Sequence, residues 1–251
     1  MAVHTTQSLA IAVFVAVVSV TGVARATVRR APPATAVVRT VTERIPSSSP
    51  AYTATLSVPQ LIWPGRRPVV DRVNATIIRW VEAQVRGFAA TVRARASGPS
   101  SLPQSSLAIS YQVTRMDAAV LSIRFTSDAY VRGQAAPSQT PAGLTFSLAS
   151  GKAYSLSSLF RPGAPYLRDL ARLITQGLKA YHPAGARCYV GGRGPSAQRA
   201  SFGAWWLNPG ALVVAYPAGE YTAAYCGPPT VTITAARLVP LLAAGSPLAP
   251  V

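Results

Sequence analysis

Between Pro68 and Arg95 the apolar residues recur at steps of three and four, which predicts a long amphipathic helix with one face on a hydrophobic core. The apolar face consists of Val69, Val73, Ile77, Trp80, Val81, Val85, Phe88 and Val92. The opposite face carries arginines at steps of seven: Arg72, Arg79, Arg86 and Arg93, here called the arginine row. At 1.5 Å rise per residue the row is about 31 Å long. Such a row is typical of a helix face exposed to solvent, of a binding surface for a linear anionic polymer, or of a helix that lies on a membrane surface.

Alternating apolar residues predict β-strands on both sides of this helix. We expect strands near residues 52–58, 107–113, 121–125, 144–148, 201–207, 211–216 and 230–234, with the second and third forming an antiparallel hairpin. Residues 128–142 and 183–200 are rich in Gly and Pro and predict loops. Residues 155–181 predict a short turn and a second amphipathic helix, and a terminal helix is expected from Ala235 to about Ala243.

Strands and helices are mixed without a regular βαβ alternation, which favours an α+β fold with antiparallel sheets. Apolar residues make up 49% of the chain and charged residues only 12%, so the chain is expected to be globular. We divide it into an N-terminal α+β subdomain over 51–142 and a C-terminal α+β subdomain over 143–251.

The amino terminus has the pattern of an export signal. An apolar run from Leu9 to Val23 ends in Ala24-Arg25-Ala26, so we expect residues 1–26 to be a cleaved signal peptide, with an uncut membrane anchor as the alternative. Residues 27–50 contain Pro, Ser, Thr and scattered Arg without an apolar period, which predicts a disordered tether. The protein is therefore expected to be secreted or associated with the cell envelope.

The two cysteines, Cys188 and Cys226, fit that compartment. An isolated pair in an oxidising environment predicts a disulfide, with metal ligation or a reactive thiol as the alternatives.

The net charge of the chain limits the classes of binding partner that we expect. The chain has 24 Lys and Arg against 7 Asp and Glu, a formal charge of +17, and its heavy use of Arg and Ala suggests a GC-rich, actinobacterial source. This charge favours an anionic cell-wall polymer, an acidic protein or a membrane surface. We expect no nucleic acid partner, because the chain has no nucleic-acid motif.

One ordered set of segments resembles a known family. The strand Leu144–Leu148, the turn Ser150-Gly151-Lys152, the segment Leu156-Ser157-Ser158-Leu159-Phe160 and Tyr166-Leu167 follow in the order seen in the extracellular domain of lysozyme-sensing anti-sigma factors. The same signature occurs in a non-catalytic region of peptidoglycan deacetylases and in secreted mycobacterial immunogenic proteins. Further matches are Asn74, Tyr221, Tyr225 and Gly227.

The resemblance implies an α+β, β-grasp-like fold with antiparallel strands around a long helix, and it carries over no catalytic residue. A His-Pro common in the family is Ala136-Pro137 here, and Cys226 lies in a segment that looks one residue short. Because only a few residues precede the apolar run, we expect no cytoplasmic anti-sigma domain. Lysozymes are usually basic, so the charge of this chain disfavours lysozyme as its partner.

Enzymatic chemistry finds little support in the sequence. After signal cleavage the only histidine is His182, and no nucleophile elbow accompanies it. A zinc site would need more ligands than one His and two paired Cys, so we expect no metal and no cofactor. The Gly191-Gly192-Arg193-Gly194 segment predicts a flexible loop rather than a phosphate loop, because no helix follows it.

Aromatic residues near the carboxyl end complete the candidate binding set. Adjacent strand residues point to opposite faces, so one of Trp205 and Trp206 is expected in the core and the other partly exposed. We take Trp206, Tyr221 and Tyr225, with the arginine row, as candidate ligand-binding residues. The leading hypothesis is a non-enzymatic binding domain. The alternatives are an envelope-glycan hydrolase with a carboxylate or His182 as catalyst, and a secreted antigen or effector that binds a host protein.

Overall fold

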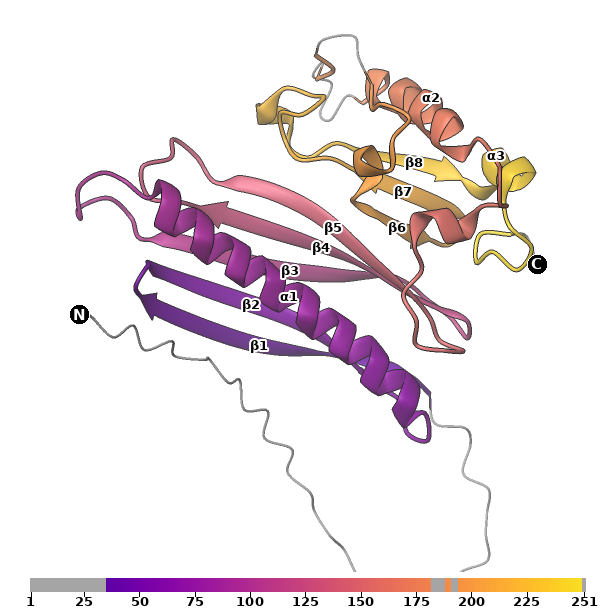
Figure 1. Ribbon diagram of the computed structural model, residues 1–251, viewed down its shortest axis with the longest axis horizontal. Coiled ribbons are helices and arrows are strands. Elements are labelled where there is room, and N and C mark those ends of the chain that lie inside the picture. The colour runs from indigo at the N-terminus through magenta and orange to yellow at the C-terminus, as the bar shows by residue number, and fades with distance from the viewer. Residues whose placement is uncertain (1–34, 182–187, 191–193, 250–251) are drawn as a thin grey trace, which may run out of the picture. The chain divides into compact units, whose positions relative to one another are not determined.

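The computed structural model describes residues 35–181, 188–190 and 194–249 (Figure 1). The predicted signal peptide, His182 and Gly191–Arg193 lie outside these residues. No helix in the described ranges is long and apolar enough to span a membrane.

A five-stranded sheet, in the order β1-β2-β3-β4-β5, forms the first part of the fold. Its strands are β1 (Val37–Ser48), β2 (Ala51–Ile62), β3 (Ser105–Met116), β4 (Val120–Tyr130) and β5 (Ser138–Ser147). Neighbouring strands are antiparallel except β2 and β3, which are parallel. A parallel pair needs a crossover, and helix α1 (Arg67–Arg95) supplies it.

Helix α1 lies along one face of this sheet, as Figure 1 shows. Its buried residues are Val69, Val73, Ile77, Val81, Phe88 and Val92, which are part of the predicted apolar face. They pack against alternate residues of the strands, among them Ile109, Ile123 and Phe125. The periodicity of the sequence therefore identified both sides of the first core.

Asn74 connects α1 to the end of β2. Its side-chain amide accepts a hydrogen bond from the Leu61 N–H at 2.8 Å and donates one to the Leu61 carbonyl at 3.0 Å. Strand β3 pairs with β2 only as far as Leu56, so Asn74 satisfies backbone groups that no neighbouring strand reaches.

A three-stranded antiparallel sheet forms the second part, from β6 (Trp205–Asn208), β7 (Ala211–Ala215) and β8 (Thr230–Thr234). Helix α2 (Tyr166–Lys179) and the short helix α3 (Ala235–Leu238) pack against β8. Leu170, Ile174 and Leu178 of α2 join Leu212 and Ile233 of the sheet in a second core. Single 3₁₀ turns occur at Leu156–Leu159, Arg199–Phe202, Ala224–Cys226 and Val239–Leu241.

The two sheets meet where β6 crosses the face of the first sheet that points away from α1. At Gly143 of β5, an added Cβ would lie 1.8 Å from the Trp205 carbonyl oxygen, so only glycine allows this approach. The buried Ser122 hydroxyl accepts a hydrogen bond from the Leu207 N–H at 2.8 Å, and Thr114 donates one to the Leu207 carbonyl at 2.8 Å. The side chains of Ser122 and Thr145 are also hydrogen-bonded, at 2.9 Å.

The α+β class is confirmed, but two predictions about segments were wrong. Half of the predicted tether 27–50, residues 37–48, is strand β1, an edge strand paired with β2 along its whole length. Both faces of β1 are largely exposed, so its sequence carries no apolar period. The loop predicted over 128–142 contains the end of β4 and the start of β5, which also crosses the proposed subdomain boundary at 142/143.

The carboxyl-terminal elements are shorter than predicted. Strand β6 begins at Trp205 rather than at 201, because residues 199–202 form a 3₁₀ turn. The terminal helix ends at Leu238, and a 3₁₀ turn containing Pro240 follows it. Proline lacks the N–H that a longer α-helix would need.

Candidate functional site

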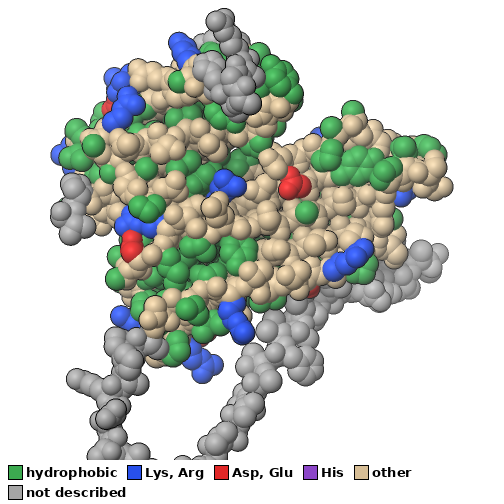
Figure 2. Space-filling model, turned by 180° about the vertical axis from the view of Figure 1, so that it is seen from behind, with side chains coloured by type: hydrophobic (Ala, Val, Ile, Leu, Met, Phe, Trp, Pro, Cys, Tyr) green, Lys and Arg blue, Asp and Glu red, His purple; other side chains and the backbone are tan. Residues whose placement is uncertain are grey.

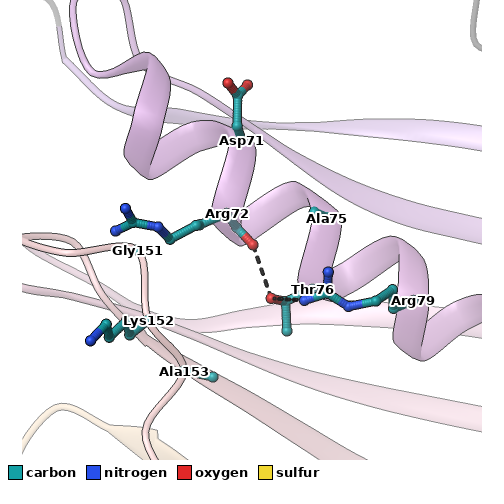
Figure 3. A pocket seen from close by; sticks show the side chains of 8 residues that line it. All are labelled: Asp71, Arg72, Ala75, Thr76, Arg79, Gly151, Lys152 and Ala153. Atoms are coloured by element: carbon teal, nitrogen blue, oxygen red, sulfur yellow. Dashed lines mark hydrogen bonds between the residues drawn. The ribbon is translucent and has the colours of Figure 1, made fainter.

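A cationic groove lies where the first turns of α1 meet the turn after β5 (Figure 3). Arg72 and Arg79 come from α1, and Lys152 comes from the turn. The groove has a volume of about 580 Å³. Its remaining lining residues are Asp71, Ala75, Thr76, Gly151 and Ala153.

The Ser150-Gly151-Lys152 turn is held against α1 by its backbone. Gly151 has φ +73°, and a Cβ there would lie 2.8 Å from the Val69 carbonyl oxygen, so glycine is required by both conformation and space. Arg72 Nη1 donates a hydrogen bond to the Ser150 carbonyl at 2.5 Å. The turn of the family-like signature therefore serves to place Lys152 beside the arginine row.

Positive charge in the groove is not balanced by nearby carboxylates. Asp71 is the one acidic lining residue, and it pairs with Arg67 at 3.7 Å. Among the described residues no carboxylate forms an ion pair with Arg72, Arg79 or Lys152. Arg79 instead donates to the Thr76 hydroxyl at 3.0 Å. Three cationic residues that line one groove favour an anionic ligand there.

The rest of the arginine row continues along the exposed side of α1. Arg86 pairs with Glu82 at 3.5 Å, which partly offsets its charge, whereas Arg93 lies in the last turn with no described ion-pair partner. On the face seen in Figure 2, Lys and Arg side chains lie at several separate places, with a small group of them at the upper left. The amino-terminal half of the row, together with Lys152, is therefore the stronger candidate site.

The aromatic candidates do not join this groove. Trp205 and Trp206 are only 8% and 3% exposed, so the expectation that one of them is partly exposed was wrong. They point to opposite faces as predicted, but each face packs on a core: Trp205 on the second core, and Trp206 on Val213 and Ala215 between the sheets.

Tyr221 and Tyr225 lie near the disulfide. Tyr225 is 79% exposed, and Tyr221 packs edge-on against Tyr216 with ring centroids 4.8 Å apart. Burial, reinforced by the charge of Glu220 and a hydrogen bond to it, raises the pKa of Tyr221. Cys188 and Cys226 form the predicted disulfide, and an isolated bridge pairs Tyr189 with Thr222 beside it.

The carboxylates are dispersed over the fold. Asp117 closes the β3–β4 turn, Asp128 accepts a hydrogen bond from Gln139 at 2.7 Å, and Asp169 pairs with Arg172 at 3.2 Å. In the part of the chain that the structure describes, no group of three or more His, Cys, Asp or Glu could hold a metal ion.

Two solved structures share this fold. A DUF3298 family member from Bacteroides fragilis aligns with a TM-score of 0.58 at 16% identity, covering 86% of this chain and 95% of that one. A DUF3298 family protein from Pseudomonas aeruginosa aligns with a TM-score of 0.52 at 16% identity, over 84% and 95% of the two chains. No protein-family model and no curated protein matches the sequence. At this identity the likeness establishes a common fold.

The sequence pattern did not identify Lys152 as a groove residue, nor Arg124 as a lining residue of a second cleft that also contains Gln112 and Trp206. Lys152 was noted only as part of the family-like turn, and its position beside α1 depends on Gly151 packing against Val69. Arg124, which lies over the Trp206 ring, interrupts the alternating apolar residues of β4, and its sequence position gave no indication of a second sheet opposite it.

Proposed function

We propose that this protein is a secreted or envelope-held, non-enzymatic domain that binds an anionic polymer of the cell envelope through the cationic groove. The observation that carries the proposal is that Arg72, Arg79 and Lys152 line one groove, while no carboxylate of the described residues forms an ion pair with them. Phosphate or carboxylate groups of a polymer would replace the water that solvates these cations.

Two further features support the proposal. The arginine row extends the groove toward Arg86 and Arg93, so successive charges of a linear polymer could follow the helix axis. The Cys188–Cys226 disulfide is a stable form in an oxidising compartment, which agrees with a location outside the cytoplasm.

Binding of the purified protein to soluble poly(glycerol phosphate) tests the proposal. The test variant is Arg72→Gln/Arg79→Gln/Lys152→Gln. Its matched control is Arg39→Gln/Arg44→Gln/Arg168→Gln, which removes the same charge at exposed positions outside the groove. Exposed charge pairs contribute about 0.2–1 kcal/mol each, so the groove variant should lose roughly tenfold in affinity.

Three results would contradict the proposal. Equal losses in the two variants would mean that net charge, not the groove, drives binding. Absence of binding to the polymer, with binding to poly-glutamate instead, would favour an acidic protein partner. Release of products from cell-wall fragments by the native protein, reduced by Glu220→Gln or His182→Ala, would favour the glycan hydrolase.

A further inference from the structure

A second polar cleft lies between the two sheets, and we propose that it binds a small sugar acid, a ligand with one carboxylate and several hydroxyl groups. The cleft has a volume of about 330 Å³ and shares no residue with the cationic groove. The two sites can therefore be tested independently.

Two rows of residues face each other across the cleft, each row made of residues that are paired on neighbouring strands of one sheet. In the first sheet, Gln112 pairs with Arg124, and Arg124 pairs with Gly143. In the second sheet, Trp206 pairs with Val213, and Val213 pairs with Thr232.

The cleft is a wedge that closes at Gly143. There the sheets are in contact, because a Cβ would lie 1.8 Å from the Trp205 carbonyl oxygen and 3.2 Å from Trp206 Cβ. Gln112 and Thr232, at the far ends of their rows, both line the cleft, whereas Gly143 does not. Arg124 is the middle residue of its row, and its guanidinium lies over the Trp206 ring, on the side of the opposing row that approaches Gly143.

Arg124 has no acidic partner in the described part of the chain. Its guanidinium carbon lies 5.7 Å from the centroid of the Trp206 ring, which holds it by a cation–π contact. Its register partners, Gln112 and Gly143, are uncharged. A planar guanidinium fixed on one face by an indole keeps its N–H edge available for bidentate binding of a carboxylate.

The rim supplies neutral hydrogen-bonding groups. Gln112, Asn208, Thr230 and Thr232 line the cleft, and none of their side chains is hydrogen-bonded to another described residue. Amide and hydroxyl groups of this kind can donate to and accept from the hydroxyls of a sugar. The volume is at the low end for ligand pockets, which favours one small molecule over a polymer segment.

Trp206 reports on this site because it lies in the wall. The experiment records the indole N–H signals of the purified protein by NMR during titration with glucuronate, with the Trp206 signal assigned from Trp206→Phe. We expect the Trp206 signal to shift in a saturable manner. Arg124→Gln should weaken binding at least tenfold, and Arg168→Gln, at an exposed position of α2 outside both sites, should leave it unchanged.

Ligand and variant controls make the result decisive. Glucose should bind at least tenfold more weakly than glucuronate, because it lacks the carboxylate, and acetate should bind more weakly because it lacks hydroxyls. If the Arg124→Gln variant does not fold, Arg124→Lys and Thr232→Val are used in its place, and each should lower the affinity for glucuronate. No shift with glucuronate, equal binding of glucose or acetate, or an unchanged affinity in the folded variants would overturn the proposal.

Discussion

Substitution of Gly143 by alanine tests how the two sheets are joined. The new Cβ would lie 1.8 Å from the Trp205 carbonyl oxygen, and ordinary contacts begin at 3.4 Å, so β6 must move away from β5. Overpacking of this kind costs about 1–3 kcal/mol. The same movement strains the hydrogen bond between Leu207 and the buried Ser122 hydroxyl, and loss of such a bond costs about 1–3 kcal/mol more. We expect Gly143→Ala to lower the free energy of unfolding by about 2–6 kcal/mol in total.

Urea unfolding followed by tryptophan fluorescence measures this change as a lower midpoint at constant slope. The matched control is Gly87→Ala in α1, where an added Cβ meets nothing within 4 Å. Because alanine favours a helix over glycine, this control should stabilise the protein by about 0.5–1 kcal/mol. A Gly143→Ala protein as stable as the native one would refute the close approach of β6 to β5, and with it the closed end of the wedge.

Three further changes test individual contacts. Asn74→Ala should lower the free energy of unfolding by about 2 kcal/mol, because both backbone groups of Leu61 lose their partner. Asn74→Asp should cost at least as much, because its second carboxylate oxygen would face the Leu61 carbonyl oxygen, which Asn74 serves as a donor. Burial opposes ionisation of Asp117, but hydrogen bonds from the backbone and from Arg115 outweigh it and lower its pKa. The ionised Asp117 therefore stabilises the fold above its ordinary pKa of 3.8. At pH 7, Asp117→Asn should lower the free energy of unfolding by about 1 kcal/mol after allowance for solvent exposure, and this loss should shrink as the pH falls below 3.8. A loss of stability that stays constant with pH would contradict this. Reduction of the Cys188–Cys226 disulfide should lower the free energy of unfolding by about 4 kcal/mol on the chain-entropy estimate, and an unchanged urea midpoint in reductant would contradict it.

The sequence predicted the elements that bury a regular apolar face. Helix α1 and the β3–β4 hairpin were predictable because their inward residues follow periods of 3.6 and 2. Strand β1 was not, because an edge strand exposed on both faces shows no such period. The disulfide was predictable because the chain has two cysteines and its amino terminus has the pattern of an export signal, which predicts an oxidising compartment.

The candidate site was only half predictable. Regular spacing along one helix identified Arg72 and Arg79, but Lys152 joins them through a turn 80 residues from Arg72 in the chain. The contact between Gly143 and Trp205 that forms the wedge depends on two sheets meeting face to face. The alternation of apolar residues in a strand gives no information about such contacts, because each sheet shows this alternation whether or not the other sheet packs against it.

The salt dependence of polymer binding tests the central claim most directly. Affinity for poly(glycerol phosphate) is measured from low to high salt for the native protein, the groove variant Arg72→Gln/Arg79→Gln/Lys152→Gln and the matched Arg39→Gln/Arg44→Gln/Arg168→Gln control. Salt screens the attraction between solvent-exposed charges, so the affinity of the native protein should fall steeply as the salt concentration rises. The affinity of the control variant should fall in parallel with it. The groove variant should bind more weakly at low salt, and its affinity should fall much less. Three parallel curves would contradict a localised anion site at Arg72, Arg79 and Lys152.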